Sequence, residues 1–313
     1  MNAITANYDE SWKEALSEYF DSFLEFFFSP IYQQIDWTKI PQALDKELQQ
    51  ITASSDTEKC VADKLYQVWL LDQQEIWILI HIEIQSQYDR DFSQRMYIYN
   101  YRAFDLYQKP VVSLAILGDE RVNWRPNSYD FKFGGYELML KFPMVKLLDY
   151  ESRWEDLVLN TNPFGMIVMA HLKTKATTSN PEQRAESKWL LVRGLYDRGL
   201  EREQIIKLFQ IIDRMMTLPN PLQQNLDFKI QKFEEERTMP LLSNMELRGV
   251  EIGALRKAQD DIKTVLQIRL GQVPSDIEEA LNNISDLSIL EEMLKSAVMV
   301  NSLDEFKQSL GNM

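Results

Sequence analysis

Residues 76 to 84 read Ile-Trp-Ile-Leu-Ile-His-Ile-Glu-Ile, so isoleucine occupies every even position of this segment. Side chains of a β-strand alternate between its two faces, so the spacing predicts a strand whose isoleucine face packs against a core. The odd positions change along the strand from apolar to polar residues: Trp77, Leu79, His81, Glu83 and Gln85. We expect the chemistry of the protein at the polar end of this strand.

A second run with strand character, residues 64 to 71, is separated from Glu75 by three residues, and the two runs predict a hairpin. With a three-residue loop, counting residue pairs outward from the loop places Tyr66 and Val68 beside the isoleucine positions and Asp63 opposite Glu83. Cross-strand neighbours have Cβ atoms about 4.5 to 5.5 Å apart, close enough for two carboxylates to share one divalent cation. The loop lacks the glycine that three-residue turns prefer, and a two-residue loop would instead move Asp63 to the isoleucine face.

In this order the motifs resemble the PD-(D/E)XK nuclease superfamily. Its signature is an aspartate followed by an acidic residue, any residue and lysine, and Asp63 with Glu83-Ile84-Gln85 is similar to it. The neighbouring Gln85-Ser86, Gln94-Arg95-Met96 and Tyr99 narrow the resemblance to the Rpn family of recombination-promoting nucleases, also called YhgA-like transposases. Tyr8-Asp9-Glu10-Ser11-Trp12-Lys13 resembles the first helix of that family. The resemblance covers roughly the first two-thirds of the chain, and its short motifs gain weight from their order.

The resemblance implies an α/β fold: a PD-(D/E)XK, restriction-endonuclease-like core in which helices flank a mixed sheet, followed by a helical extension and a small all-α C-terminal domain. It implies a divalent-metal-dependent DNA endonuclease, an enzyme that hydrolyses phosphodiesters and promotes recombination or serves mobile elements. Asp63, Glu83 and the backbone carbonyl of Ile84 would bind Mg²⁺, Mn²⁺ or Ca²⁺, which prefer oxygen ligands. DNA is the expected partner and a homodimer is one option, whereas no nucleotide cofactor is expected.

Gln85 stands where the superfamily has its lysine, beside the attacking water. A glutamine amide can orient a water molecule, but it carries no charge and cannot take up a proton. We therefore expect slow turnover in which the metal does most of the activation. The alternative is a catalytically weak or inactive protein that keeps the nuclease fold as an interaction scaffold or as a DNA-binding module.

The residues Asp91-Phe92-Ser93-Gln94 have the form of a capping box and predict a helix from about Phe92 to Gln108. On this helix Arg95, Tyr99 and Arg102 share a face. By resemblance the helix flanks the active strand. Arg95 is therefore a candidate contact for phosphate or for an active-site carboxylate, with Tyr99 in support, although exposed helix charges are equally ordinary on a protein surface.

Net charge is the main objection to a nucleic-acid enzyme, because 48 acidic against 34 basic residues give −14. An acidic face near the start of the chain, most simply a solvated one, comprises Asp9, Glu10, Glu14 and Glu18. Nucleases of the superfamily often place one further acid on their first helix. The sequence does not select one of the four, and the resemblance points to Asp9. Residues 171 to 207 are locally basic, with eight lysines and arginines against five acids, so a basic groove is an option.

The pattern along the chain predicts several further elements. Residues 9 to 28 predict one aromatic amphipathic helix that Pro30 ends, and residues 111 to 117 predict a buried strand reached by a helical crossover. Two strands are expected on either side of Gly134-Gly135, at residues 129–133 and 136–140. Later helices are expected at residues 163–173, 181–196 and 201–216.

The last part of the chain predicts a helical module. A helix from about Ala258 to Leu270 precedes Ser-x-x-Glu capping boxes at Ser275, Ser288 and Ser302. This module resembles the small C-terminal domain of unknown function often appended to cyanobacterial members of the family. The predicted domains are residues 1–235, the nuclease-like part with its helical extension; residues 236–260, a linker helix; and residues 261–313, the small helical domain.

The sequence excludes several classes of protein. A single cysteine, Cys60, cannot form an internal disulfide. No run of 18 apolar residues is present, and the first residues lack the pattern of a signal peptide, so we expect a cytoplasmic protein without a membrane span. Glycine-rich phosphate loops, paired cysteines and Gly-x-Ser-x-Gly turns are absent from the sequence, which removes most other enzyme classes.

Overall fold

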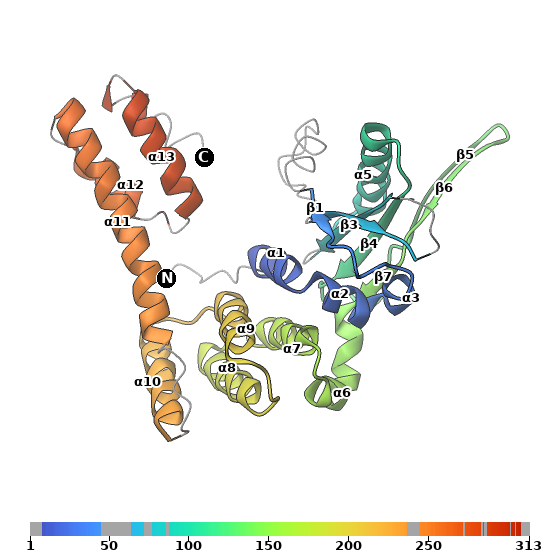
Figure 1. Cartoon of the computed structure of the whole chain (residues 1–313), viewed down its shortest axis with the longest axis horizontal. Helices are drawn as coiled ribbons and strands as arrows, with labels where there is room; N and C mark the ends of the chain where they lie inside the picture. The colour runs from blue at the N-terminus through green and yellow to red at the C-terminus, as the bar shows by residue number, and fades with distance from the viewer. Residues whose placement is uncertain are drawn as a thin grey trace. The chain divides into compact units, whose positions relative to one another are not determined.

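The computed structural model describes residues 8–44, 64–71, 77–85, 88–236, 244–271, 273–282, 284, 287–300, 302–303 and 305–307. Only the backbone is described for residues 77–85, 236, 244–254, 256, 268, 275–276, 279, 282 and 287–288. The chain divides into two units, Met1–Leu226 and Asp227–Met313. The fold is mixed α/β and mostly helical, which confirms the predicted class at that coarse level (Figure 1).

Within the described residues, the first unit contains a five-stranded mixed sheet in the order β1-β2-β3-β4-β7. The strands are β1 (Gln42–Ala43), β2 (Lys64–Trp69), β3 (Trp77–Gln85), β4 (Val111–Leu117) and β7 (Met144–Lys146). β3 is antiparallel to β2 and parallel to β4, and β4 is parallel to β7. Helix α5 (Phe92–Tyr107) connects β3 to β4. The crossover predicted from the sequence is therefore confirmed.

The register of the β2–β3 hairpin is the one that a three-residue loop predicts. Lys64 pairs with Ile82, and the alignment continues without a shift to the pair of Trp69 and Trp77. Tyr66 accordingly pairs with one of the isoleucines, Ile80. Asp63 and the loop at residues 72–76 lie outside the described residues. Over the part that the structure describes, the two-residue alternative is wrong.

Helix α5 covers one face of the sheet. Phe92 and Met96, in its first turns, pack against Ala115 and Leu117 of β4. Further along the helix, Tyr99 packs with Leu65 of β2 in a second cluster. Ala115 and Leu117 are two positions apart in β4, so their side chains lie on the same face of the sheet.

Helices α1 (Tyr8–Glu18) and α2 (Phe20–Phe27) contact the opposite face of the sheet. The ring of Tyr66 stacks on Phe20 with centroids 3.8 Å apart, and its hydroxyl donates to the carbonyl oxygen of Leu16 over 2.9 Å. Leu65 and Tyr66 are neighbours in β2, so their contacts with α5 and α2 lie on opposite faces of the sheet.

The single helix predicted over residues 9 to 28 is wrong. Tyr19 has φ −135° and ψ 42°, which ends α1 and lets α2 start in a new direction. Phe23 and Phe27 of α2 then pack on Phe164, with ring centroids 5.3 and 5.6 Å apart. Pro30 does not end a helix but lies in the first turn of α3 (Ser29–Tyr32), where its missing N–H needs no partner.

A two-stranded ribbon, β5 (Ser128–Phe133) and β6 (Tyr136–Lys141), extends beyond the sheet (Figure 1). Its turn is formed by Gly134 and Gly135, at φ +54° and +87°. Two positive φ angles are typical of the tight turns that match strand twist, and glycine adopts them without strain. The strand pair predicted from the sequence is confirmed.

The remainder of the first unit is helical, and the three helices predicted there are confirmed. The elements are the 3₁₀ helix η1 (Leu147–Arg153), α6 (Trp154–Leu159), α7 (Pro163–Ala176), α8 (Pro181–Tyr196) and α9 (Arg202–Met215), and α10 (Asn220–Glu236) begins in this unit and continues past Leu226 into the second. Asn162 and Asn180 cap α7 and α8 by accepting backbone N–H bonds over 3.0 Å. The Asn220-Pro221 pair, which interrupts the pattern in the sequence, opens α10.

The second unit contains α11 (Asn244–Leu270), α12 (Ser275–Asn282) and α13 (Leu287–Met299). It has its own apolar core, including Leu266, Leu281 and Leu290, each with no exposed surface. The helix predicted to start near Ala258 starts at Asn244. Of the capping boxes, the third is supported by a bond from the N–H of Glu305 to Oγ of Ser302, at 3.2 Å. Nowhere in the described chain is a helix both long enough and apolar enough to cross a lipid bilayer.

Candidate functional site at the carboxyl edge of the parallel strands

Strands β3, β4 and β7 run in the same direction and end at one edge of the sheet. The register aligns Gln85 of β3 with Leu117 of β4, and Leu117 with Lys146 of β7. Open α/β sheets bind ligands beyond the carboxyl ends of their strands, where loops and helix ends meet. This edge is therefore the candidate site, and it includes the polar end of the strand singled out in the sequence.

The backbone places positions 83 and 85 in the part of the sheet that α5 covers. Position 83 pairs with Ala115 and position 85 with Leu117, and both of these β4 residues pack against α5. Ile84 pairs with Ile116 between them. The side chains of Glu83 and Gln85, and the whole of Asp63, lie outside the described residues, so the predicted carboxylate pair remains a prediction.

Arg95 lies in the first turn of α5, close to this edge. Its guanidinium contacts the carboxylate of Asp89 and lies over the ring of Phe92, 5.4 Å from the centroid. The other carboxylate oxygen of Asp89 accepts the N–H of Asp91 over 2.8 Å. Arg95 therefore contacts a carboxylate outside the predicted pair, that of Asp89, and its contact with a phosphate or an active-site carboxylate stays a prediction. The capping box at Asp91 is wrong, because the Asp91 side chain makes no capping hydrogen bond.

Tyr99 and Asp9 occupy different environments. The side chain of Tyr99, a residue of α5, is buried next to Leu65 and Ala103, where it supports the packing of the helix on the sheet. Asp9 is exposed in the first turn of α1. Since α1 and α5 lie on opposite faces of the sheet, the structure does not bring Asp9 together with Arg95 and Tyr99.

A buried ion pair at the same edge was missed by the sequence analysis. Lys146 ends β7 and contacts the carboxylate of Asp119, just after β4, with side chains 0% and 4% exposed. The ammonium also lies 3.4 Å from the carbonyl oxygen of Trp124, and Asp119 accepts the N–H of Arg121 over 2.8 Å. Because a buried charge is costly without such partners, the pair holds residues 118–124 against the ends of β4 and β7. The feature of the sequence that could have indicated this pair is Asp119, an aspartate just after the buried strand predicted at residues 111 to 117.

Aromatic and cationic side chains extend this edge toward solvent. The exposed Arg121 lies over the ring of Tyr88, 3.9 Å from its centroid, and Tyr88 meets Trp124 edge-on at 5.5 Å. A guanidinium stacked on a ring keeps its N–H groups at its rim, where they can bind an anion such as phosphate. Arg121 is thus a further candidate for substrate contact.

His171 lies on the other side of the segment that follows β4. Its Nδ1 accepts the indole N–H of Trp12 over 3.2 Å, and its Nε2 lies 3.0 Å from the carbonyl oxygen of Gly118. Burial lowers the pKa of His171 to about 4, and its bond to Gly118 opposes this only partly. The imidazole is therefore neutral, with both nitrogens engaged, and its role is structural.

A cavity of about 320 Å³ adjoins His171. Its polar lining includes Asp119, Glu120, Glu151 and Lys175. Lys175 also lies over the ring of Tyr8, 5.1 Å from the centroid, and burial raises the pKa of Tyr8 to about 12. The lining is mostly acidic, which does not favour an anionic ligand.

The acidic face of α1 is more than a solvated surface. Glu14 and Glu10 lie 3.0 and 3.8 Å from the guanidinium of Arg214 in α9, and Glu18 contacts Lys207 of the same helix. These pairs join two helices that are far apart in the sequence. Of the two cations, Lys207 belongs to the basic segment at residues 171–207, so one of its positive charges is used in this contact.

More of that positive charge is used inside the fold. Arg184 donates to the carbonyl oxygens of Thr174 and Thr177 over 3.2 and 3.3 Å, at the C-terminal end of α7. Lys188 donates to Met216 at the end of α9 over 2.9 Å, and Arg198 donates to Leu157 of α6 over 2.8 Å. Helix C-terminal ends have carbonyls without helical partners, which these cations satisfy. The basic segment therefore stabilises helix ends, which weakens its interpretation as a DNA groove.

Neither the described side chains nor known proteins assign a metal site or a family to this chain. Among the side chains that the structure describes, which exclude Asp63 and Glu83, no cluster of three or more His, Cys, Asp or Glu residues could hold a metal ion. Comparison with family models, with curated proteins and with solved structures finds no match for this chain.

Proposed function

We propose that the chain is a divalent-metal-dependent DNA endonuclease of PD-(D/E)XK type, with Asp63, Glu83 and Gln85 at its site. The observation that carries the proposal is the hairpin register, in which Lys64 pairs with Ile82. One more pair in the same register would align position 63 with position 83. Cross-strand neighbours at about 4.5 to 5.5 Å between Cβ atoms suit two carboxylates that bind one cation.

The surrounding topology supports the same proposal. The family resemblance implies a mixed sheet flanked by helices, and the hairpin β2–β3 followed by α5 and the parallel strand β4 is such an arrangement. The polar residues of β3 stand at its carboxyl end, the edge at which α/β sheets bind ligands. Arg95 and Arg121 come from elements at that edge, and they are candidates for contact with a DNA phosphate.

The donor set suits a hard cation. Asp63 and Glu83 would supply carboxylate oxygens and Ile84 a carbonyl oxygen, which favours Mg²⁺, Mn²⁺ or Ca²⁺ over zinc. Such a cation neutralises phosphate charge and lowers the pKa of a bound water. Gln85 would orient the attacking water through its amide, and because it takes up no proton we propose slow turnover.

A second candidate function is a DNA-binding module or interaction scaffold that keeps the fold without cleaving DNA. Three observations favour it: glutamine at position 85, the net charge of −14, and the use of Arg184, Lys188 and Arg198 at helix ends. Binding without cleavage would appear as a salt-dependent shift of DNA mobility.

A plasmid-nicking assay in Mg²⁺, Mn²⁺ and Ca²⁺ separates the two functions. Wild type, Asp63→Ala and Glu83→Ala would be compared with Glu186→Ala, an acid-to-alanine control at an exposed position of α8. We expect nicking by wild type and the control, and its loss in both site variants. Folded wild type that nicks no DNA in any of the three metals would exclude the nuclease.

A further inference from the structure

The β5–β6 ribbon has one wholly apolar face. Its strands pair Phe133 with Tyr136, Phe131 with Leu138, and Tyr129 with Leu140, and cross-strand partners point to the same side. The other face carries Ser128, Asp130, Lys132, Glu137, Met139 and Lys141. The ribbon is thus amphipathic along its whole length, as a strand pair with a buried face would be.

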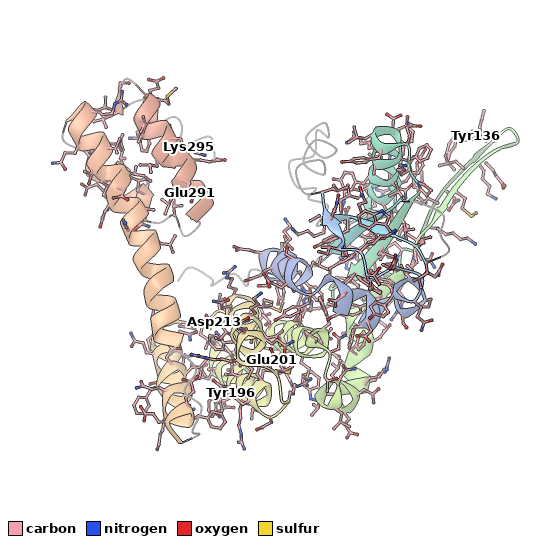
Figure 2. All side chains as sticks on the ribbon, viewed as in Figure 1. Tyr136, Tyr196, Glu201, Asp213, Glu291 and Lys295 are labelled. Atoms are coloured by element: carbon pink, nitrogen blue, oxygen red, sulfur yellow. The ribbon has the colours of Figure 1, made fainter. Side chains whose placement is uncertain are left out.

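Among the residues that the structure describes, only those at the base of the ribbon cover that apolar face. Tyr129 stacks on Tyr97 of α5 with centroids 5.0 Å apart, and Leu140 packs against the cluster around Phe92. Toward the turn, Phe133 is 77% exposed and Phe131 is 52% exposed. Tyr136, labelled in Figure 2, lies near the end of the ribbon and away from the sheet. An isolated two-stranded ribbon is marginally stable in water, so an apolar face at its end favours a partner.

The same apolar surface continues along α5. Tyr97 stacks on Tyr101 at an interplanar angle of 19°, and Tyr101 and Phe104 are 53% and 45% exposed. Positions 97, 101 and 104 share one side of a helix. We name as the aromatic band the exposed residues Tyr101, Phe104, Phe131, Phe133 and Tyr136.

The size of the aromatic band suits an interface. An exposed aromatic side chain offers about 150 to 250 Å². Five side chains that are 45% to 77% exposed therefore present roughly 500 Å². Patches of about 300 to 600 Å² on single chains are often functional. Two such bands would bury roughly 1,000 Å² in total, which is about the minimum for a specific protein interface.

Charge around the ribbon selects among partners. Its polar face carries two acids and two lysines, and Lys132 contacts Glu137 across the strands. DNA and anionic membranes bind surfaces with an excess of positive charge, which the ribbon lacks. Two copies of a chain with net charge −14 repel each other, so they can meet most readily where the surface is apolar and locally neutral.

We infer that the aromatic band is the interface between two copies of this chain. The band has two parts, the end of the ribbon and the stripe on α5, and a twofold axis lets the ribbon of each copy lie on the α5 stripe of the other. The same patch then serves on both copies, as the commonest class of dimer requires. The inference does not depend on the proposed nuclease function.

Analytical ultracentrifugation of the full chain from about 1 to 100 µM tests the interface. We expect a dimer for wild type, and dimerisation at least about tenfold weaker for Phe133→Ser/Tyr136→Ser, since aromatic anchors dominate interfaces. Leu159→Ser is the matched control, because Leu159 is 82% exposed but lies in α6, outside the band. A wild type that stays monomeric, or a dimer that the double variant leaves unchanged, would overturn the inference.

Photocrosslinking identifies the surface that the ribbon contacts. A benzophenone amino acid would replace Tyr136, and ordinary and ¹⁵N-labelled chains of this variant would be mixed. Crosslinks between light and heavy chains, to the peptide that contains Tyr101 and Phe104, support the inference. Crosslinks confined to single chains would show that a segment of the same chain covers the band, and they would overturn it.

Discussion

The indole N–H of Trp12 donates a hydrogen bond to Nδ1 of His171 over 3.2 Å, although the two residues are 159 positions apart. Nε2 of the same ring lies 3.0 Å from the carbonyl oxygen of Gly118. One neutral imidazole therefore joins α1, α7 and the segment after β4, directly beside the candidate site.

This arrangement predicts a loss of stability in acid. Burial lowers the pKa of His171 to about 4 from 6.5, so between these values the unfolded state takes up a proton that the folded state excludes. Stability should fall as pH decreases from 6.5 to 4, by about 3 kcal/mol from this residue. Urea unfolding of wild type and His171→Gln across this range measures the effect. Equal pH slopes for the two proteins would contradict the prediction.

The Lys146–Asp119 pair predicts an asymmetric mutational response. Lys146→Met should cost about 3 to 5 kcal/mol, because it leaves the buried carboxylate of Asp119 without its cation. Lys146→Met/Asp119→Leu should recover much of that loss, since no charge remains buried. Chemical unfolding of both single variants and the double variant forms the cycle. Lys132→Met, in the exposed pair with Glu137, is the control and should change little. Additive losses would show that the two groups act independently.

Gln85→Lys tests whether glutamine limits the proposed nuclease. A lysine at this position can hold positive charge beside the attacking water, and positioned proton-transfer groups contribute about 10²- to 10⁴-fold to rates. We expect nicking in Mg²⁺ to rise at least about tenfold from wild type. Gln94→Lys, a lysine added at an exposed position of α5, controls for the change in net charge. A similar increase in both variants would attribute the gain to DNA affinity alone.

Arg121 and Arg125 form a matched pair for DNA binding. Arg121 lies over Tyr88, whereas Arg125 is joined to Asp149 by two hydrogen bonds of 2.8 and 2.5 Å. If Arg121 binds a phosphate, Arg121→Ala should weaken DNA binding and reduce the slope against salt by about one, while Arg125→Ala should do less. Fluorescence anisotropy at several salt concentrations measures both. Equal effects would show that only net charge matters.

The core of the second unit predicts local destabilisation. Leu290 has no exposed surface and packs in a cluster whose members all come from residues 255–306. Leu290→Ala should cost about 2 to 5 kcal/mol, through lost burial and the cavity left behind. Hydrogen exchange should therefore increase in α11 and α13 but not in α7. An equal increase in α7 would show that the two units unfold together.

Local patterns determined many of the elements. The alternation of residues 76–84 predicted β3 and, with the loop length, its register against β2. The bounds of β4, the turn at Gly134-Gly135 and the helices after Pro163 and Pro181 also follow from short patterns. Strand period, turn glycines and helix caps act over a few residues, so they can be recognised without the fold.

Tertiary structure alone decided how these elements meet. The break at Tyr19, after which Phe23 packs on Phe164, and the pairing of Lys146 with Asp119 depend on contacts between distant segments. So does the use of Arg184 and Lys188 at helix ends, which a count of charges treats as free surface charge. The sequence by itself determined the strand with its polar end. Packing decided which charges surround it, because the partner that a charge finds depends on the position of segments far along the chain.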